Sequence, residues 1–275
     1  IKRFGFDAAI IFSDILMLPY GLNQKVKFEK NFGPKLGDLN LDDLKEIDED
    51  YFTNKLNSVY NAIELTSKHQ LLENRDMIGF VGAPWTILVY MINKVSPKKN
   101  LIDQFFNDNH LVTELIKIIE KFLKIHIKNQ IKAGANVIQI FDSWAGLLEN
   151  KFEEFIYTPT FNLVEYTKSF NIPVICFPRG IKDYKKYCEI VKPDAVNIDY
   201  DIDPKEIIKD IKIPIQGGLD PKILLSDKDN LKKHSERYLK IFKDHPYIFN
   251  LGHGILPETK IELVSELINI VRNYK

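Results

Sequence analysis

Short apolar segments alternate with longer segments whose apolar residues recur every three to four positions along this chain of 275 residues. A short apolar run is typical of a buried strand, and the longer period is typical of a helix. Seven runs predict strands, at Ala8–Phe12, Met77–Gly82, Val137–Phe141, Val174–Phe177, Ala195–Ile198, Pro214–Gln216 and Tyr247–Asn250. Helices are predicted at residues 56–72, 111–125, 152–170, 183–191, 231–242 and 258–271.

This alternation, with no linker rich in Ser or Gly, predicts one parallel α/β domain over residues 1–275. A doubly wound open sheet would accommodate seven strands, but its first strand should lead into a glycine-rich phosphate turn, and none follows here. We therefore favour a (β/α)₈ TIM barrel, which needs eight strands, and expect its first strand upstream of Ile1. Residues 25–50, rich in Lys and Asp, are expected to form a long loop and a short helix.

Asp14 is the most informative residue for function. It follows the first predicted strand, and α/β barrels place their active sites at the carboxyl ends of their strands. The structural alternative is that Asp14 caps the helix after the strand.

Other strand ends carry polar or aromatic side chains with similar alternatives. Tyr90 could be a core tyrosine with a local hydrogen bond, and Ser143 or the preceding Asp142 could cap a helix. Arg179 could be a loop residue, whereas the glycines beside His253 favour an exposed histidine with room for a ligand. Asp220 before Pro221 is most simply a helix N-cap.

Composition excludes several classes of protein. Acidic and basic residues balance at 38 each, so no net charge favours binding to nucleic acid or to a membrane surface. The sequence contains no apolar run of membrane-spanning length. Two cysteines are too few for a disulfide framework, and Cys176 is expected in the core. No thiolate zinc pattern, Walker loop or serine-nucleophile motif occurs, so neither a metal nor a nucleotide is expected, and the expected location is cytoplasmic.

Five segments together resemble uroporphyrinogen decarboxylase. They occur in the order of that family and are RFGFDAAIIFSDIL (residues 3–16), IGFVGAPWTILVYM (78–91), GANVIQIFDSWAG (134–146), PIQGGLDP (214–221) and NLGHGILPET (250–259). The resemblance implies a (β/α)₈ barrel, usually a homodimer, that acts on a tetrapyrrole substrate without a cofactor. The implied enzyme converts the four acetate side chains of uroporphyrinogen to methyls and releases carbon dioxide.

The same resemblance implies roles for individual residues. Asp14 matches the carboxylate that binds the four pyrrole N–H groups, and Tyr90, Ser143 and His253 match substrate-binding residues. Phe80 and Phe141 resemble apolar contacts to the macrocycle. A carboxylate fixed near the ring nitrogens would stabilise the positive charge that develops when a pyrrole carbon is protonated.

Three features depart from the family. Its M-R-Q-A-G-R segment, which supplies arginines for the substrate carboxylates and a candidate proton donor, is expected upstream of these residues, so the chain as written is expected to be inactive. Gly218 stands where the family commonly has Asn. Arg179 is not a family-wide feature, and we interpret it as a contact to a propionate of the substrate.

Two other functions compete with this interpretation. A corrinoid-dependent methyltransferase would share the fold, but it would need a thiolate-bound zinc. A non-catalytic tetrapyrrole-binding or scaffold protein would not need Asp14, Tyr90, Ser143 and His253 together.

Overall fold

The computed structural model describes residues 1–29, 33–97 and 108–274, and the chain divides into two compact units. The first unit consists mainly of residues 6–181, with residues 190–193. The second consists mainly of residues 194–275, with residues 2–5 and 182–189. That residues 1–275 form one barrel domain remains a prediction.

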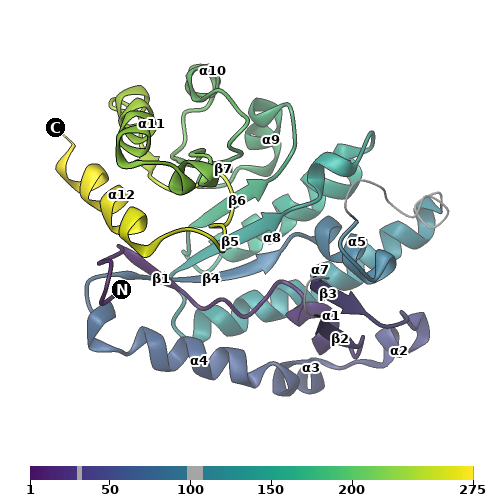
Figure 1. Cartoon of the computed structure of the whole chain (residues 1–275). Helices are drawn as coiled ribbons and strands as arrows, with labels where there is room; N and C mark the ends of the chain where they lie inside the picture. Colours follow the sequence, from purple (N-terminus) through teal and green to yellow (C-terminus); the bar gives the residue numbers. More distant parts are fainter. Residues whose placement is uncertain (30–32, 98–107, 275) are drawn as a thin grey trace. The chain divides into compact units, whose positions relative to one another are not determined.

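Four parallel strands form the sheet of the first unit (Figure 1). They are, in spatial order, β1 (Ala8–Ile10), β4 (Asp76–Gly82), β5 (Val137–Asp142) and β6 (Val174–Pro178). β4 to β6 are mostly buried, in keeping with their nearly continuous apolar sequences. The register pairs Ile10 with Ile78 and Phe141 with Phe177, so the carboxyl ends of these strands lie at one edge.

Helices pack on this sheet because each has an apolar face. α4 (Asn57–Ser67) and α7 (Asn109–Lys132) both contact β4, and α8 (Thr158–Lys168) contacts α7 and β6. The single π-helical turn η3 (Glu153–Tyr157) leads into α8. His126 of α7 is buried, with its Nδ1 3.0 Å from the Tyr60 hydroxyl, so it is a packing residue of the first unit.

The segment expected to be a loop and a helix is only partly so. The short helix α1 (Met17–Gly21) is followed in the sequence by β2 (Val26–Glu29) and β3 (Gly33–Leu36). These two strands pair in an antiparallel hairpin. The expected helix is present as α2 (Leu41–Glu46), and α3 (Glu49–Lys55) follows it. The loop prediction was wrong because the alternation Val-Lys-Phe-Glu, which is a strand pattern, was obscured by the many charges.

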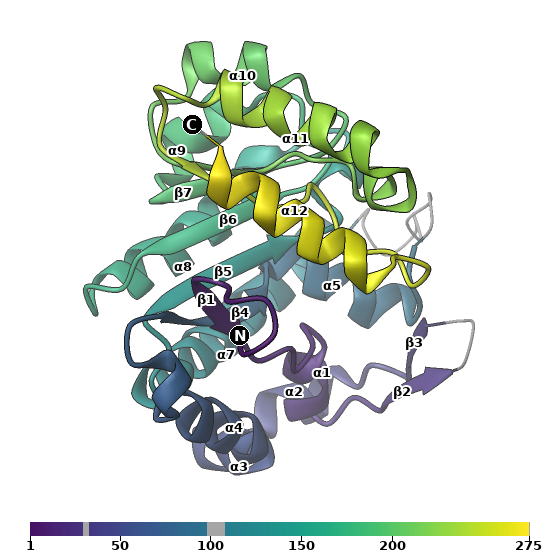
Figure 2. The same ribbon diagram turned by 60° about the vertical axis from the view of Figure 1, so that its left-hand side comes forward.

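The second unit also contains parallel strands. β7 (Ala195–Ile198), β8 (Ile215–Gly217) and β9 (Tyr247–Ile248) are neighbours in that order. The helices of this unit are α9 (Tyr184–Val191), α10 (Pro204–Asp210), α11 (Lys228–Ile241) and α12 (Ile261–Asn273), with the 3₁₀ turn η4 (Pro221–Leu225). Figure 2 shows α11 and α12 running side by side, and the two helices are in contact.

All seven predicted strands are present, with ends shifted by at most two residues. Asp220 is the N-cap of η4, as predicted, and its carboxylate accepts a hydrogen bond from the Lys222 N–H at 2.9 Å. The last helix begins at Ile261, not at Glu258, so the helix start predicted from Pro257 was wrong. Among the described residues no helix is both long enough and apolar enough to cross a membrane.

Gly218 follows β8 in a conformation that other residues rarely adopt. Its φ is +102°, and a Cβ atom there would lie 2.7 Å from a ring carbon of Tyr238. The Tyr238 hydroxyl donates a hydrogen bond to the Gly218 carbonyl at 2.6 Å, and the Tyr247 hydroxyl donates one to the Gly217 carbonyl at 2.8 Å. Two tyrosines therefore hold this turn through its backbone carbonyls.

We expect Gly218→Ala to destabilise the protein by about 1–3 kcal/mol, because it adds backbone strain and a collision with the Tyr238 ring. Urea unfolding measures the change. Gly254→Ala is the matched control, since no atom lies within 4 Å of a Cβ built there. Equal effects of the two substitutions would contradict the role assigned to Gly218.

Candidate active site

Asp14 lies four residues beyond the end of β1 with an unusual backbone conformation, φ +120°. Such a conformation is costly for a residue other than glycine and persists only where the surroundings impose it. Its Oδ1 accepts a hydrogen bond from the Leu16 N–H at 2.7 Å. The N-cap of α1 is Leu16, without a side-chain cap, so Asp14 braces a turn and is not the helix cap of the alternative interpretation.

Burial raises the pKa of the half-buried Asp14 carboxyl, and the Leu16 hydrogen bond partly opposes that rise. Desolvation disfavours the charged form, and N–H donors favour it. The Asp14 carboxylate would therefore gain from a ligand that brings further N–H groups.

A row of phenylalanine rings begins at Phe12, two positions before Asp14, and runs across β4, β5 and β6. Phe12 stacks on Phe80 with ring centroids 5.8 Å apart, and Phe80 meets Phe141 edge-on at 5.7 Å. Phe141 meets Phe177 of β6 edge-on at 6.2 Å. Phe12 is 84% exposed, because β1 ends at Ile10 and leaves this ring beyond the strand. Phe12 is exposed and Phe141 is partly exposed, whereas Phe80 and Phe177 are buried. Phe12 and Phe141 therefore provide the apolar and aromatic surface of the row, which can hold the flat face of a ring system.

Tyr90 and Ser143 come from neighbouring elements. Tyr90 lies on α5 (Pro84–Asn93), is buried, and has its hydroxyl 3.4 Å from Ser96 Oγ. Its ring meets Trp144 edge-on at 5.8 Å, and Ser143 directly precedes Trp144. The local hydroxyl contact fits the core-tyrosine alternative, so the substrate-binding role of Tyr90 stays a prediction.

Arg179 follows β6 and is half-buried. Its N–H donates to the Asp142 carbonyl, and its own carbonyl accepts from the Gly146 N–H, both at 3.0 Å. These bonds hold Arg179 beside the turn that contains Ser143. Within the first unit, Asp14, Ser143 and Arg179 follow strands, Phe80 and Phe141 lie near the ends of theirs, and Tyr90 is on α5. The contacts between them join Phe80 to Phe141, and Tyr90 to Trp144 beside Ser143.

His253 belongs to the second unit and is exposed there. The expectation that both neighbouring glycines leave open space holds for Gly254, which has no neighbour near a Cβ position. It is wrong for Gly252, which packs on the backbone of Tyr200.

Asp142 was considered only as a possible helix cap, and that interpretation is wrong. It is the last residue of β5, is 1% exposed, and its Oδ1 accepts a hydrogen bond from the Thr86 hydroxyl at 2.6 Å. Its Oδ2 is buried without a hydrogen-bond partner among the described residues. Burial raises the pKa of this carboxyl to about 7, although the Thr86 hydroxyl opposes the rise. Its place at the end of an apolar strand was the available signal.

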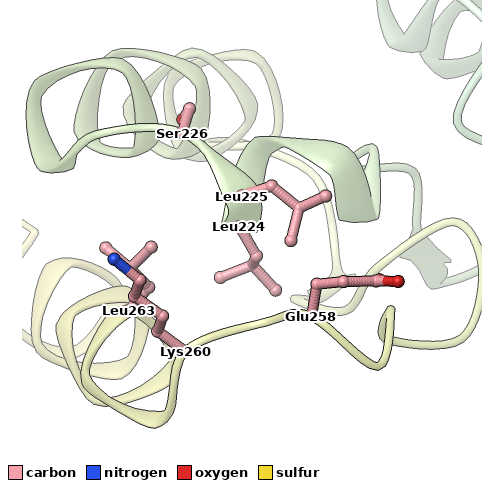
Figure 3. A pocket seen from close by; sticks show the side chains of 6 residues that line it. All are labelled: Leu224, Leu225, Ser226, Glu258, Lys260 and Leu263. Carbon is pink, nitrogen blue, oxygen red and sulfur yellow. The ribbon is translucent and has the colours of Figure 1, made fainter.

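No group of three His, Cys, Asp or Glu residues within residues 1–29, 33–97 and 108–274 could hold a metal ion. A cavity of about 220 Å³ in the second unit lies between η4 and the start of α12, lined by Leu224, Leu225, Ser226, Glu258, Lys260 and Leu263. Figure 3 shows Leu224 pointing into this space. It is smaller than a typical small-molecule site of about 300–1,000 Å³.

Parallel strands followed by helices, with polar and aromatic residues at the strand ends, define an α/β protein with the site arrangement of TIM-barrel enzymes. Comparison with known proteins agrees. A methyltransferase from Methanosarcina mazei has a similar structure, with a TM-score of 0.81 at 17% identity over 98% of this chain and 81% of that one. At this identity the similarity concerns the fold alone.

The family model for uroporphyrinogen decarboxylase (URO-D) matches residues 1–274. The uroporphyrinogen decarboxylase of Rickettsia bellii (strain RML369-C) is 42% identical over all of this chain and 83% of its own length. That of Orientia tsutsugamushi (strain Ikeda) is 39% identical over all of this chain and 82% of its own. The chain belongs to the uroporphyrinogen decarboxylase family, whose members are carboxy-lyases with a TIM-barrel-like fold.

We expect Asp142→Asn to gain stability relative to the wild type as the pH rises from about 4 to about 7. The folded-state pKa lies above the unfolded value of 3.8, so the folded wild type binds more protons in this window and loses stability as the pH rises. Asn keeps an acceptor for Thr86 and does not ionise. The difference should reach a few kcal/mol, at about 1.4 kcal/mol per pKa unit.

Urea unfolding of both proteins at several pH values measures this difference. Contributions from His126, whose pKa burial lowers to about 4, are common to both proteins and cancel. A difference that does not change with pH would show that the Asp142 carboxyl has an ordinary pKa.

Proposed function

We propose that this protein decarboxylates the four acetate side chains of uroporphyrinogen to methyls, giving coproporphyrinogen and carbon dioxide. Membership of the family supports the activity. The single observation that carries the mechanism is the braced Asp14 carboxylate beside the row of phenylalanine rings. It combines an anionic group with an apolar surface of the kind a tetrapyrrole would need.

Asp14 would accept hydrogen bonds from the pyrrole N–H groups at the centre of the macrocycle. These charge-assisted bonds would orient a flexible ligand and lower the pKa that burial raises, so the carboxylate would stay ionised. Leu16 occupies Oδ1 from one side, which leaves the rest of the carboxylate for the ligand.

The reaction needs a place for the electron pair that the breaking C–CO₂ bond releases. Protonation of a pyrrole carbon makes the ring that electron acceptor, and positive charge develops on the ring. After carbon dioxide leaves, the exocyclic carbon takes up a proton to become the methyl group and the ring carbon loses the proton it gained, so one proton is consumed for each carbon dioxide released. A carboxylate fixed in a partly buried site stabilises this charge more strongly in the transition state than in the ground state. No cofactor is required by this scheme.

The other residues would bind the periphery of the substrate. Phe80 and Phe141 would contact the macrocycle, while Tyr90, Ser143 and His253 would bind its polar groups. Arg179 would pair with a propionate, as guanidinium groups readily do with carboxylates. We further propose a homodimer in the cytoplasm.

Asp14→Asn tests the central step. We expect kcat for carbon dioxide release from uroporphyrinogen by the full-length protein to fall by about 100- to 1,000-fold, because a neutral amide cannot stabilise the developing charge. Substrate binding should persist in part. Asp244→Asn, at an exposed carboxylate, is the matched control and should retain full activity. Undiminished activity of Asp14→Asn would overturn the mechanism.

Arg179→Ala tests the propionate contact. We expect KM for uroporphyrinogen to rise about 10-fold with little change in kcat, because a charge-assisted hydrogen bond made equally in both states is lost. Arg237→Ala removes an exposed arginine that pairs with Asp203 and is the control. Unchanged substrate affinity in Arg179→Ala would exclude the contact.

A further inference from the structure

Four hydrogen bonds join the start of α5 to the end of β5 in the first unit. The Ala83 N–H donates to the Phe141 carbonyl at 2.8 Å. The indole N–H of Trp85 donates to the Trp144 carbonyl at 3.1 Å. The other two bonds share one atom, the hydroxyl oxygen of Thr86.

The Thr86 hydroxyl is both an acceptor and a donor of hydrogen bonds. It accepts a hydrogen bond from the Trp144 N–H at 3.0 Å and donates one to Asp142 Oδ1 at 2.6 Å. Thr86 is 0% exposed, so water does not replace these bonds when the hydroxyl is removed. A hydroxyl group can donate and accept hydrogen bonds at once, and a methyl group can do neither.

The residues joined by these hydrogen bonds are neighbours of two of the predicted substrate-binding residues. Ser143 lies between Asp142 and Trp144, so the bonds to Thr86 hold the residues on both of its sides. Tyr90 is four positions after Thr86 on α5, which places the two side chains on one helix face. The Tyr90 ring also packs edge-on against Trp144.

We propose that Thr86 and Asp142 are positioning residues that hold Ser143 and Tyr90 in fixed relation for catalysis, through the chain Trp144 N–H to Thr86 to Asp142. This role rests on the proposed function, because Ser143 and Tyr90 are substrate-binding residues only there. Asp142 is buried below the turn and acts through its neighbours. Small displacements of binding groups have large kinetic effects, since a shift of about 1 Å can cost about 100-fold in rate.

Thr86→Val is the decisive variant, because it keeps the shape of the side chain and removes both bonds. We expect kcat/KM for uroporphyrinogen to fall at least 10-fold, and Thr86→Ser, which keeps the hydroxyl, to restore it. Thr167→Val is the matched control in α8. It removes another fully buried hydroxyl, which donates to the Leu163 carbonyl at 2.8 Å, and it should leave kcat/KM unchanged.

The two indole N–H resonances give a readout that does not depend on activity. The chain has two tryptophans, Trp85 and Trp144, and both take part in this contact. In ¹H–¹⁵N spectra we expect Thr86→Val to shift both resonances, and Thr86→Ser and Thr167→Val to leave them near their wild-type positions. Unmoved resonances in a folded Thr86→Val protein would overturn the bonding chain itself.

A double-mutant cycle with Ser143→Ala separates positioning from general loss of stability. If Thr86 acts through Ser143, Thr86→Val should cost much less activity in the Ser143→Ala background than alone. Strictly additive losses, or shifted resonances with unchanged kcat/KM, would overturn the positioning role. A wild-type protein without carbon dioxide release would overturn the proposed function and this role together, whereas the resonances would still test the bonding chain.

Discussion

Carboxylates buried at the ends of apolar strands impose the main constraint on this structure. Burial disfavours the charged form of both Asp14 and Asp142 and raises the pKa of each. Each carboxyl has one strong hydrogen bond from its own surroundings, from the Leu16 N–H for Asp14 and from the Thr86 hydroxyl for Asp142. The residues around both strand ends must therefore provide the hydrogen bonds that water would otherwise provide.

The two carboxyls differ in their exposure, and so in whether their hydrogen-bond partners must all come from the protein. Asp142 is buried at the end of β5, where burial favours the neutral, protonated form below its pKa of about 7. Asp14 is only half-buried and lies beside exposed Phe12, so a ligand can reach it. This difference in access separates the roles that we propose, with Asp14 meeting the substrate and Asp142 supporting the residues that do.

Local patterns were sufficient to predict most of the fold of each unit. Every predicted strand is present, because buried parallel strands leave short, mostly apolar runs such as VICF at residues 174–177. The β2–β3 hairpin was missed because its charged residues concealed a strand alternation. The start of α12 was misplaced because proline permits a helix start without requiring one.

The candidate site was predictable only in part, for a different reason. Asp14 could be selected because a carboxylate after an apolar run is unusual, and the motifs that resemble the family gave it a role. Nothing in a linear pattern shows that Thr86 bonds to Asp142, because the two residues are 56 positions apart and meet only through the register of β4 and β5. Hydrogen bonds between residues far apart in the sequence can be recognised only when the fold is known.

The fold by itself does not determine the chemistry. A methyltransferase shares it at 17% identity, so the same strands and helices serve proteins with different names. What distinguishes members of such a fold is the set of side chains at the strand ends and the bonds that hold them. Here those bonds hold a half-buried Asp14 carboxyl two positions after the exposed ring of Phe12, an arrangement that suits the tetrapyrrole substrate that we propose.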